Sequence, residues 1–328
     1  MTVLSELETN RFRAWVKDLW GIRIAGVCDT VLIQGSPERS LSRAVFRASS
    51  GQRFLMEKFA PEKIEIRQRV AETLAFVNKN GLDRALAPEP ARDGAYLPRY
   101  GDGYFQITRF LDSTALKRPD WLTSADMGKE MAGFLVEMNR ACDGISNRIT
   151  YPGFSLKTYI YRLFKDMQGH APKIHDRYLP VLRFLEKGFM AEHDRLPLVF
   201  CHGDFHPLNV IWQEQKISAV IDWEFTGIKP ECYDAANLVG CAGIEHPEGL
   251  AMPMVTRFLK ELRREGLISG FGWTWFPEYI LALRFAWLSE WLRKNDTQML
   301  ETELAFMNIL IRHMAELRDI WSFKEEPL

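Results

Sequence analysis

The chain has 328 residues, of which 47% are apolar, enough for a large buried core. Its 42 basic and 43 acidic residues almost cancel, which argues against non-specific binding to nucleic acid. The five cysteines form no CxxC pair, and their odd number disfavours a secreted disulfide framework. The N-terminal segment lacks the apolar core of a signal peptide, and nowhere do about 18 uncharged apolar residues run together. These features predict a soluble, cytoplasmic protein with neither nucleic acid nor a membrane as partner.

The N-terminal third of the chain alternates between strand-like and helical patterns. One helix is expected over residues 5–20, with Ser5 and Glu8 as a capping box, and a second over 61–80. Short β-branched and aromatic runs between turn residues indicate strands around these helices. Strands, a helix and strands again predict an antiparallel α+β unit. The strands are expected over residues 26–34, 44–48, 54–59, 95–97 and 104–110.

From Ser124 onward, apolar residues recur at helical spacing over most of the chain. The exception is the stretch 198–223, where short apolar runs flank a loop, an arrangement that often holds catalytic groups. We therefore expect two domains, a strand-rich one over residues 1–108 and a mainly helical one over 109–328. The helices are expected at about 127–142, 155–168, 176–190, 248–265, 278–294 and 298–320.

The residues with the clearest chemistry lie in Cys201-His-Gly-Asp-Phe-His-Pro-Leu-Asn209, followed by Val220-Ile-Asp-Trp-Glu224. A kinase catalytic loop is written H-R-D-x-x-x-x-N, and a second Asp follows at the end of a strand. The same order occurs here, with a glycine in place of the arginine. It is formed by His202, Asp204, Asn209 and Asp222.

These residue types suit phosphoryl transfer. The reaction passes through a loose transition state, so the enzyme mainly positions groups and neutralises charge. Mg²⁺ prefers hard oxygen ligands, which the Asn209 amide and the Asp222 carboxylate offer. Asp204 is then the expected catalytic base, because its carboxylate would accept a hydrogen bond from the acceptor hydroxyl and take its proton late.

The motifs resemble those of the aminoglycoside phosphotransferase and choline kinase superfamily, which includes homoserine-kinase-like members. Its signature is H-G-D-x-x-x-x-N, then I-D-[WFY]-E, then a D-x-A-N/Y-like element, matched here by Tyr233-Asp-Ala-Ala-Asn237. The resemblance implies a protein-kinase-like α+β fold with a small antiparallel-sheet N-lobe and a larger, mainly helical C-lobe. It also implies that His202 braces the catalytic loop, that Asp234 anchors it, and that Glu224 lies at the mouth of the metal site.

The same resemblance implies ATP and Mg²⁺ as cofactors. The expected acceptor is a small hydroxylated molecule, such as an amino alcohol, an amino acid, a sugar or an aminoglycoside. Residues 1–108 would bind the nucleotide, and 109–328 would carry the catalytic loop, the metal site and the acceptor-binding helices. The identity of the acceptor, the choice of ATP over GTP and the oligomeric state stay open.

Superfamily members grip the phosphates with a strand lysine that pairs with a helix glutamate. Lys58 is the expected lysine, and it shares a strand face with Phe54 and Met56. Glu72 is its expected partner, with Glu65 as a second choice. A shift of one residue would put Glu57 in the lysine position instead.

The loop expected to cover the phosphates, residues 35–43, contains no GxGxxG motif. It offers hydroxyl groups and backbone amides, and the candidate phosphate contacts are Ser40, Ser42 and Arg43. Residues 106–111 are expected to lie against the adenine.

Two other functions are compatible with parts of this pattern. A nucleotide-binding protein without catalysis would keep the fold, although it would have no need of the three metal-site and base residues. A hydrolase would use His202, Asp204 and His206 as transition-metal ligands, leaving the residues from Asn209 to Asp222 unexplained. The aromatic residues near 273–291 could form a cage for a quaternary ammonium, but their helical spacing favours a core stripe.

Overall fold

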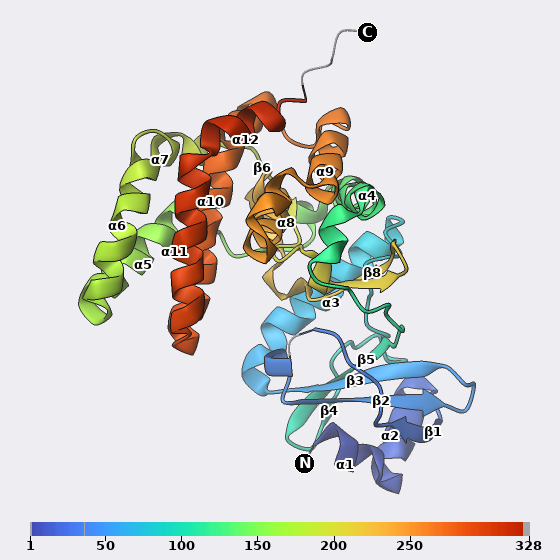
Figure 1. The fold of residues 1–328 in the computed structure, drawn as a ribbon. Helices are drawn as coiled ribbons and strands as arrows, with labels where there is room; N and C mark the ends of the chain where they lie inside the picture. Colours follow the sequence, from blue (N-terminus) through green and yellow to red (C-terminus); the bar gives the residue numbers. More distant parts are fainter. Residues whose placement is uncertain (1, 36, 324–328) are drawn as a thin grey trace. The chain divides into compact units, whose positions relative to one another are not determined.

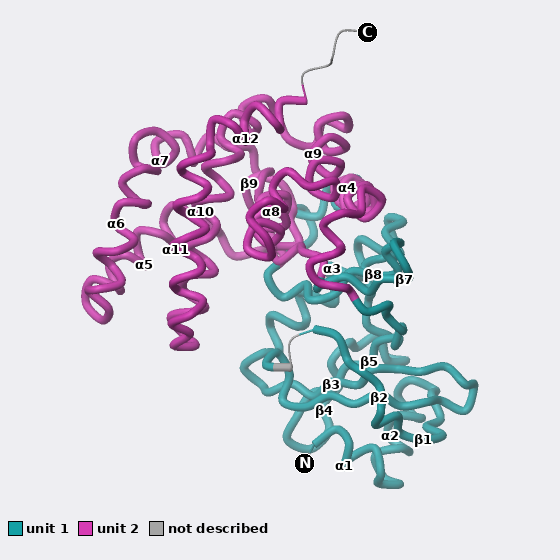
Figure 2. Tube along the Cα trace, in the orientation of Figure 1, with its two compact units in different colours: residues 1–115, 140–150, 208–225 teal, residues 116–139, 151–207, 226–328 magenta. Residues whose placement is uncertain are grey.

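The computed structural model describes residues 2–35 and 37–323. It is a mixed α+β structure, as the sequence predicts (Figure 1). The chain forms two compact units, which are distinguished by colour in Figure 2. Unit 1 comprises residues 1–115, 140–150 and 208–225, and unit 2 comprises residues 116–139, 151–207 and 226–328.

Unit 1 is built on a five-stranded antiparallel sheet with the strand order β1-β2-β3-β5-β4 (Figure 1). Its register places Arg43 of β2 and Gln106 of β5 directly opposite Glu57 of β3. Since side chains at paired positions point to the same face of a sheet, these three form a row on one face. The strands are β1 (Ile24–Cys28), β2 (Ser42–Ala48), β3 (Arg53–Phe59), β4 (Arg99–Tyr100) and β5 (Gly103–Arg109).

The other face of the sheet packs against two short N-terminal helices, α1 (Val3–Leu7) and α2 (Asn10–Trp20). The single helix expected over 5–20 is therefore wrong. Thr2 and Thr9 each cap a helix through the side-chain oxygen, which accepts the N–H of Ser5 and of Phe12 respectively. The core between helices and sheet contains Val3, Leu7, Phe12, Val16, Phe46, Phe54, Met56, Phe105 and Ile107.

The row formed by Arg43, Glu57 and Gln106 belongs to the lining of a cavity, to which a helix and a hairpin also contribute. The helix is α3 (Ile64–Lys79), which begins after a 3₁₀ turn at Pro61–Lys63. The hairpin consists of β7 (Val210–Gln213) and β8 (Lys216–Val220). The expected strand at 95–97 is absent, and β5 instead pairs with β4. The strand predicted over 26–34 is shorter than expected and ends at Cys28, whereas the other predicted strands and the helix at 61–80 are confirmed to within a few residues.

Unit 2 is mainly helical and contains one two-stranded sheet, of β6 (Leu198–Cys201) and β9 (Gly227–Pro230). The core stripe expected at Ile280, Leu283, Trp287 and Trp291 of the longest helix is confirmed only for Ile280 and Leu283, which are buried, whereas both tryptophans are partly exposed. None of the described helices combines the length and apolarity needed to cross a membrane. The helices are α5 (Leu156–His170), α6 (Pro172–Glu186), α7 (Phe189–Glu192), α8 (Tyr233–Glu245), α9 (Pro253–Arg264), α10 (Gly270–Lys294), α11 (Thr297–Arg312) and α12 (Met314–Ile320); α4 (Ala125–Ala141) runs from unit 2 into unit 1.

Candidate functional site

In unit 2, the loop that begins at His202 follows strand β6 directly, and one buried carboxylate holds it. Asp234, at the start of α8, accepts the backbone N–H of His202 at 2.7 Å and that of Gly203 at 2.8 Å. Gly203 has a φ of 85°, in the left-handed region that glycine adopts without strain. The anchoring geometry expected of Asp234 is therefore present.

The environment of Asp234 is nearly dry, because its exposed fraction is 4%. Burial raises the pKa of this carboxyl to about 6, although the two N–H groups and the Lys229 ammonium favour the charged form. Lys229 itself is buried on β9, and its ammonium lies 5.2 Å from the ring centre of Phe154 and 5.3 Å from that of Tyr233. Burial lowers the pKa of Lys229.

Asp204 occupies the tip of the loop, with a side chain that is 15% exposed. The backbone N–H of Asp204 donates a hydrogen bond to Nδ1 of His202, whose ring is fully buried. This bond holds the two residues of the loop together. Nε2 of His206 lies 3.5 Å from Oδ1 of Asp204, and the His206 ring packs on Trp287. His206 is thus a neighbour of the expected base. In the described residues, no three His, Cys, Asp or Glu side chains are grouped so as to hold a metal.

In unit 1, the β7–β8 hairpin brings the two expected metal ligands to the same end of a strand pair. Val210 pairs with Val220, and the N–H of Ile221 donates to the carbonyl of Asn209 at 3.0 Å. Asn209 and Asp222 therefore flank the open end of the hairpin, although they are far apart in sequence. Asp222 has a φ of 66°, a left-handed conformation that is uncommon for a residue with a side chain and often marks functional sites.

The Asp222 carboxylate is covered by the segment that precedes β2. Nη1 of Arg39 lies 3.5 Å from Oδ1 of Asp222 and donates to the Asp222 carbonyl at 3.3 Å. Gly35 approaches from the same segment: a methyl group placed on it would lie 3.1 Å from Oδ1, and its φ is 86°. Only glycine suits that backbone position without strain.

Glu224 lies among three cationic side chains. Its carboxylate oxygens are 3.3 Å from Lys63 Nζ, 3.6 Å from Arg67 Nη2 and 3.7 Å from Arg39 Nε. Neither Arg39 nor Arg67 was singled out from the sequence. In the sequence, each has charged neighbours, as arginines of solvent-exposed turns and helices usually do. No feature of the sequence therefore distinguishes them from surface arginines.

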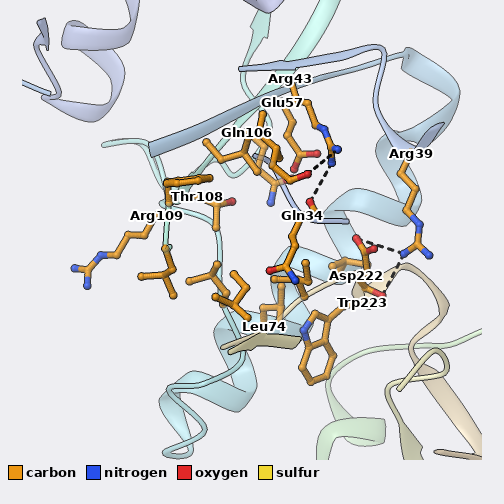
Figure 3. Close-up of a pocket in the computed structure, with 18 of the residues that line it drawn as sticks. Gln34, Arg39, Arg43, Glu57, Leu74, Gln106, Thr108, Arg109, Asp222 and Trp223 are labelled. Carbon is orange, nitrogen blue, oxygen red and sulfur yellow. Dashed lines mark hydrogen bonds and ion pairs between the residues drawn. The ribbon is translucent and has the colours of Figure 1, made fainter. Parts of the chain in front are cut away.

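The cavity of unit 1 has an apolar part and a charged part (Figure 3). Four arginines and two carboxylates belong to its lining, so positive charge predominates there. In Figure 3, Arg43, Glu57 and Gln106 lie next to one another, and Arg39 reaches toward Asp222. Most of the stretch 106–111 lines the cavity. The apolar part includes Leu55, Val70, Leu74, Leu86, Ile211 and Ile221.

The structure does not bring Lys58 to this cavity. Neighbouring residues of a strand point to opposite faces, and Lys58 shares the face of Phe54 and Met56, which the N-terminal helices cover. Its ammonium pairs with Asp102 at 2.7 Å, and its stem fills the space beside Gly103, where a methyl group would lie 2.3 Å from Lys58 Cε. Glu57 lies on the cavity face instead. This is the arrangement that the sequence leaves open as an alternative, in which a shift of one residue puts Glu57 in the position of the lysine.

The expected pair of Lys58 with Glu72 is corrected by the same geometry. Glu72 is exposed on α3 and accepts a hydrogen bond from Gln68, one turn earlier. The second choice, Glu65, pairs with Arg69 and is also exposed. Neither Glu72 nor Glu65 therefore pairs with Lys58, whose carboxylate partner is Asp102.

The other candidates on the covering segment divide between the two faces. Ser42 lies on the face of Lys58 and accepts the N–H of Val3 at 2.9 Å, so it serves the packing of α1. Arg43 donates to the carbonyls of Ile33, Gln34 and Gly35 at 3.1 Å each, and so clamps the segment. Residue 36 lies outside the described residues.

Burial raises the pKa of Glu57, and the nearby Ser40 hydroxyl is the smallest of the effects that oppose this rise. The buried hydroxyl of Ser40 makes no hydrogen bond of normal geometry with a described residue. The Ser40 hydroxyl therefore still has hydrogen-bonding capacity beside the cavity.

The residues at the end of the hairpin fit a magnesium ion. Asn209 supplies an amide oxygen and Asp222 a carboxylate, the hard donors that Mg²⁺ takes. The Asp222 carboxylate also lies 3.5 Å from the positively charged guanidinium of Arg39.

Comparisons with known proteins agree with this fold. The model of the phosphotransferase enzyme family (APH) matches residues 35–279, most of the chain. No match was found among curated protein sequences.

Among solved structures, an amicoumacin kinase in complex with AMP-PNP and Ca²⁺ is 12% identical, with a TM-score of 0.63 over 96% of this chain and 94% of that chain. An aminoglycoside phosphotransferase from Alicyclobacillus acidocaldarius is 14% identical, with a TM-score of 0.59 over 91% and 95% of the two chains. A macrolide 2′-phosphotransferase from Brachybacterium faecium is 11% identical, with a TM-score of 0.55 over 92% and 98%. These similarities extend over whole chains, and the chain belongs to the phosphotransferase enzyme family.

Proposed function

We propose that the protein transfers the γ-phosphate of ATP, with Mg²⁺, to a hydroxyl group of a small molecule. One observation carries the proposal: Asn209 and Asp222 meet at one end of a hairpin, and Asp222 lines a cavity with an apolar part and an excess of arginines. A nucleotide has the same two parts, a flat base and a polyanion. The domain over residues 1–108, together with this hairpin, would bind it.

The residues divide the work as follows. Asn209 and Asp222 would hold the metal ion, which supplies positive charge to the phosphates. Asp204 would accept the hydrogen bond of the acceptor hydroxyl, align its oxygen for in-line attack and take its proton as the new bond forms. Asp234 and His202 would keep Asp204 in place through the contacts described above. His206, 3.5 Å from Asp204, would limit the orientations of that carboxylate.

The acceptor is proposed to be an amino alcohol, an amino acid, a sugar or an aminoglycoside. Support comes from the relatives of known fold, whose names include an aminoglycoside phosphotransferase, a macrolide phosphotransferase and an amicoumacin kinase. All three names denote enzymes that phosphorylate small molecules. The helices of residues 109–328 would supply the acceptor contacts.

The test is a panel of hydroxylated metabolites and aminoglycosides incubated with Mg-ATP, with ADP release as the readout. We expect release with at least one acceptor, and loss of more than about a hundredfold in Asp204→Asn and Asp222→Asn. Asp166→Asn, an exposed change on α5, serves as the matched control and should keep full activity. Full activity in both site variants would refute the proposal. Magnesium-dependent ATP binding without turnover on any acceptor would favour the non-catalytic alternative.

A further inference from the structure

The strand position next to Lys58 carries a carboxylate that faces the cavity of unit 1. Glu57 lies between Arg43 and Gln106 in the row of paired residues across β2, β3 and β5. Burial raises the pKa of Glu57, and the opposing effects come first from Arg67 of α3 and then from Arg43. Glu57 therefore lies in the cavity lining, opposite Arg43 in the sheet and together with Arg67 of α3.

Lys58 has a complete structural role on the opposite face. Its side chain is 3% exposed, pairs with Asp102 and lies near the ring of Phe105. Moving its ammonium to the cavity would require the strand to turn over, because a shift of one residue reverses every side chain. The cavity therefore takes its positive charge from arginines.

Arg67 lines the cavity and has one donor unused by the described residues, although its Nη2 also lies 3.6 Å from the Glu224 carboxylate. Its side chain is 11% exposed and stacks on Phe59, with the guanidinium carbon 4.4 Å from the ring centre. Nη2 donates to the carbonyl of Arg39 at 3.2 Å, while Nε is buried and has no partner in the described part of the chain. A held guanidinium with an unused N–H is suited to receive an anion.

Two acceptor atoms in the same lining also lack partners among the described residues: Oε1 of Gln34 and Oε1 of Gln106. Gln106 is 7% exposed, so its amide oxygen has little access to bulk water. A buried polar atom without a partner costs about 1–3 kcal/mol. A ligand with hydrogen-bond donors, such as a base amine or a ribose hydroxyl, would satisfy both oxygens.

We propose that Arg67, assisted by Arg43, binds the phosphates of the nucleotide in this protein, and that Glu57 is a counter-charge to the two arginines when the cavity is empty. The ligand class is a nucleoside polyphosphate. The inference rests on the proposed function, because it assumes that the cavity of unit 1 is the nucleotide site.

Arginine suits this task because its guanidinium stays charged and forms two parallel hydrogen bonds to phosphate oxygens. Without a ligand, the carboxylates of Glu57 and Glu224 offset part of the positive charge of Arg43 and Arg67. When phosphates enter, they take over the role of counter-ion. Glu57 then lowers the affinity for the anion, since it is a like charge close to it.

The experiment measures the affinities of the full-length protein for ADP and for adenosine by calorimetry, in the wild type and in two variants. The ratio of the two affinities reports the phosphate contacts, because both ligands share the nucleoside part. Arg67→Gln is expected to reduce this ratio by at least about tenfold and to leave adenosine binding nearly unchanged. Lys58→Gln, the matched control, is expected to leave the ratio unchanged.

The inference would be overturned if the ratio of affinities did not change in Arg67→Gln. It would also be overturned if the ratio fell in Lys58→Gln by as much as is expected for Arg67→Gln. Neither result would contradict nucleotide binding itself. If Arg67→Gln lowered the affinities for ADP and for adenosine equally, the inference would also be overturned, because the replacement would then have disrupted the whole cavity rather than a contact with the phosphates. If the wild-type protein bound neither ADP nor adenosine, the proposed function itself would fail.

Discussion

The replacement Asp234→Asn separates the placement of the catalytic loop from the stability of the protein. Asparagine has the same shape as aspartate, but its amide oxygen can accept only one of the two N–H groups from His202 and Gly203. The amide NH₂ then faces the second N–H, which loses its acceptor. A buried N–H without a partner costs about 1–3 kcal/mol.

A second effect opposes this loss. Burial raises the pKa of Asp234 from 3.8 to about 6, so above pH 6 the ionised carboxylate costs about 3 kcal/mol relative to its unfolded state. The neutral amide does not have this cost. The two effects nearly cancel, and we expect the free energy of unfolding of Asp234→Asn at pH 7.5 to lie within about 2 kcal/mol of the wild type.

Catalysis is expected to respond far more strongly, because the loop that carries Asp204 would shift when one of its two anchors is lost. A displacement of about 1 Å can cost about a hundredfold in rate. We therefore predict that kcat falls at least tenfold in Asp234→Asn, as measured by ADP release under saturating substrates. Asp166→Asn controls for loss of a surface charge. A normal kcat together with normal stability would refute the anchoring role of Asp234.

The pH dependence of stability gives an independent check on the same residue. A carboxyl whose pKa is raised on folding binds its proton more tightly in the folded state, so stability falls as pH rises between the two pKa values. The wild type should lose up to about 3 kcal/mol between about pH 4 and pH 6, relative to Asp234→Asn, and no more above that range. Denaturant unfolding at several pH values measures this difference. Parallel curves for the two proteins would contradict the burial argument.

Three further predictions concern packing and charge. Arg284 of α10 and Glu303 of α11 form a fully buried ion pair, with Nε to Oε2 at 3.0 Å, so Arg284→Met should cost about 3–5 kcal/mol in denaturant unfolding. The double replacement Arg284→Met with Glu303→Leu should recover most of that loss, and a cost below about 1 kcal/mol for the single change would contradict it. Gly35→Ala should destabilise by about 1–2 kcal/mol, because of its positive φ and its approach to Asp222; unchanged melting would count against the strain. Glu57→Gln should raise the affinity for ADP severalfold in calorimetry, and a weaker affinity would exclude the counter-charge role.

The elements of the fold could be predicted wherever burial gave the sequence a period. Strands β2 and β3 and helix α3 follow the predicted ranges to within a few residues, since each presents one face to a core. Helix α8 was missed because it is buried on nearly all sides and has no polar face to reveal a helical period. Strand β9 was missed because its four residues include a glycine, a lysine and a proline.

The site could be predicted only in part, for a similar reason. The proposed catalytic loop and the hairpin match a known motif by residue type and spacing, so Asp204, Asn209 and Asp222 stand out in the sequence. Alternation also placed Lys58 on the face of Phe54 and Met56. It could not show that the N-terminal helices cover that face, because such packing depends on residues distant in the chain.

The most direct test of the central claim is detection of the transferred phosphoryl group. The protein is incubated with Mg-ATP and the acceptor identified by ADP release, and the product is analysed by mass spectrometry, with Asp204→Asn in parallel. A phosphotransferase yields an acceptor heavier by one phosphoryl group and an equal amount of ADP, and the variant yields neither. ADP formed together with free phosphate and an unmodified acceptor would contradict transfer to a hydroxyl and indicate hydrolysis of ATP instead.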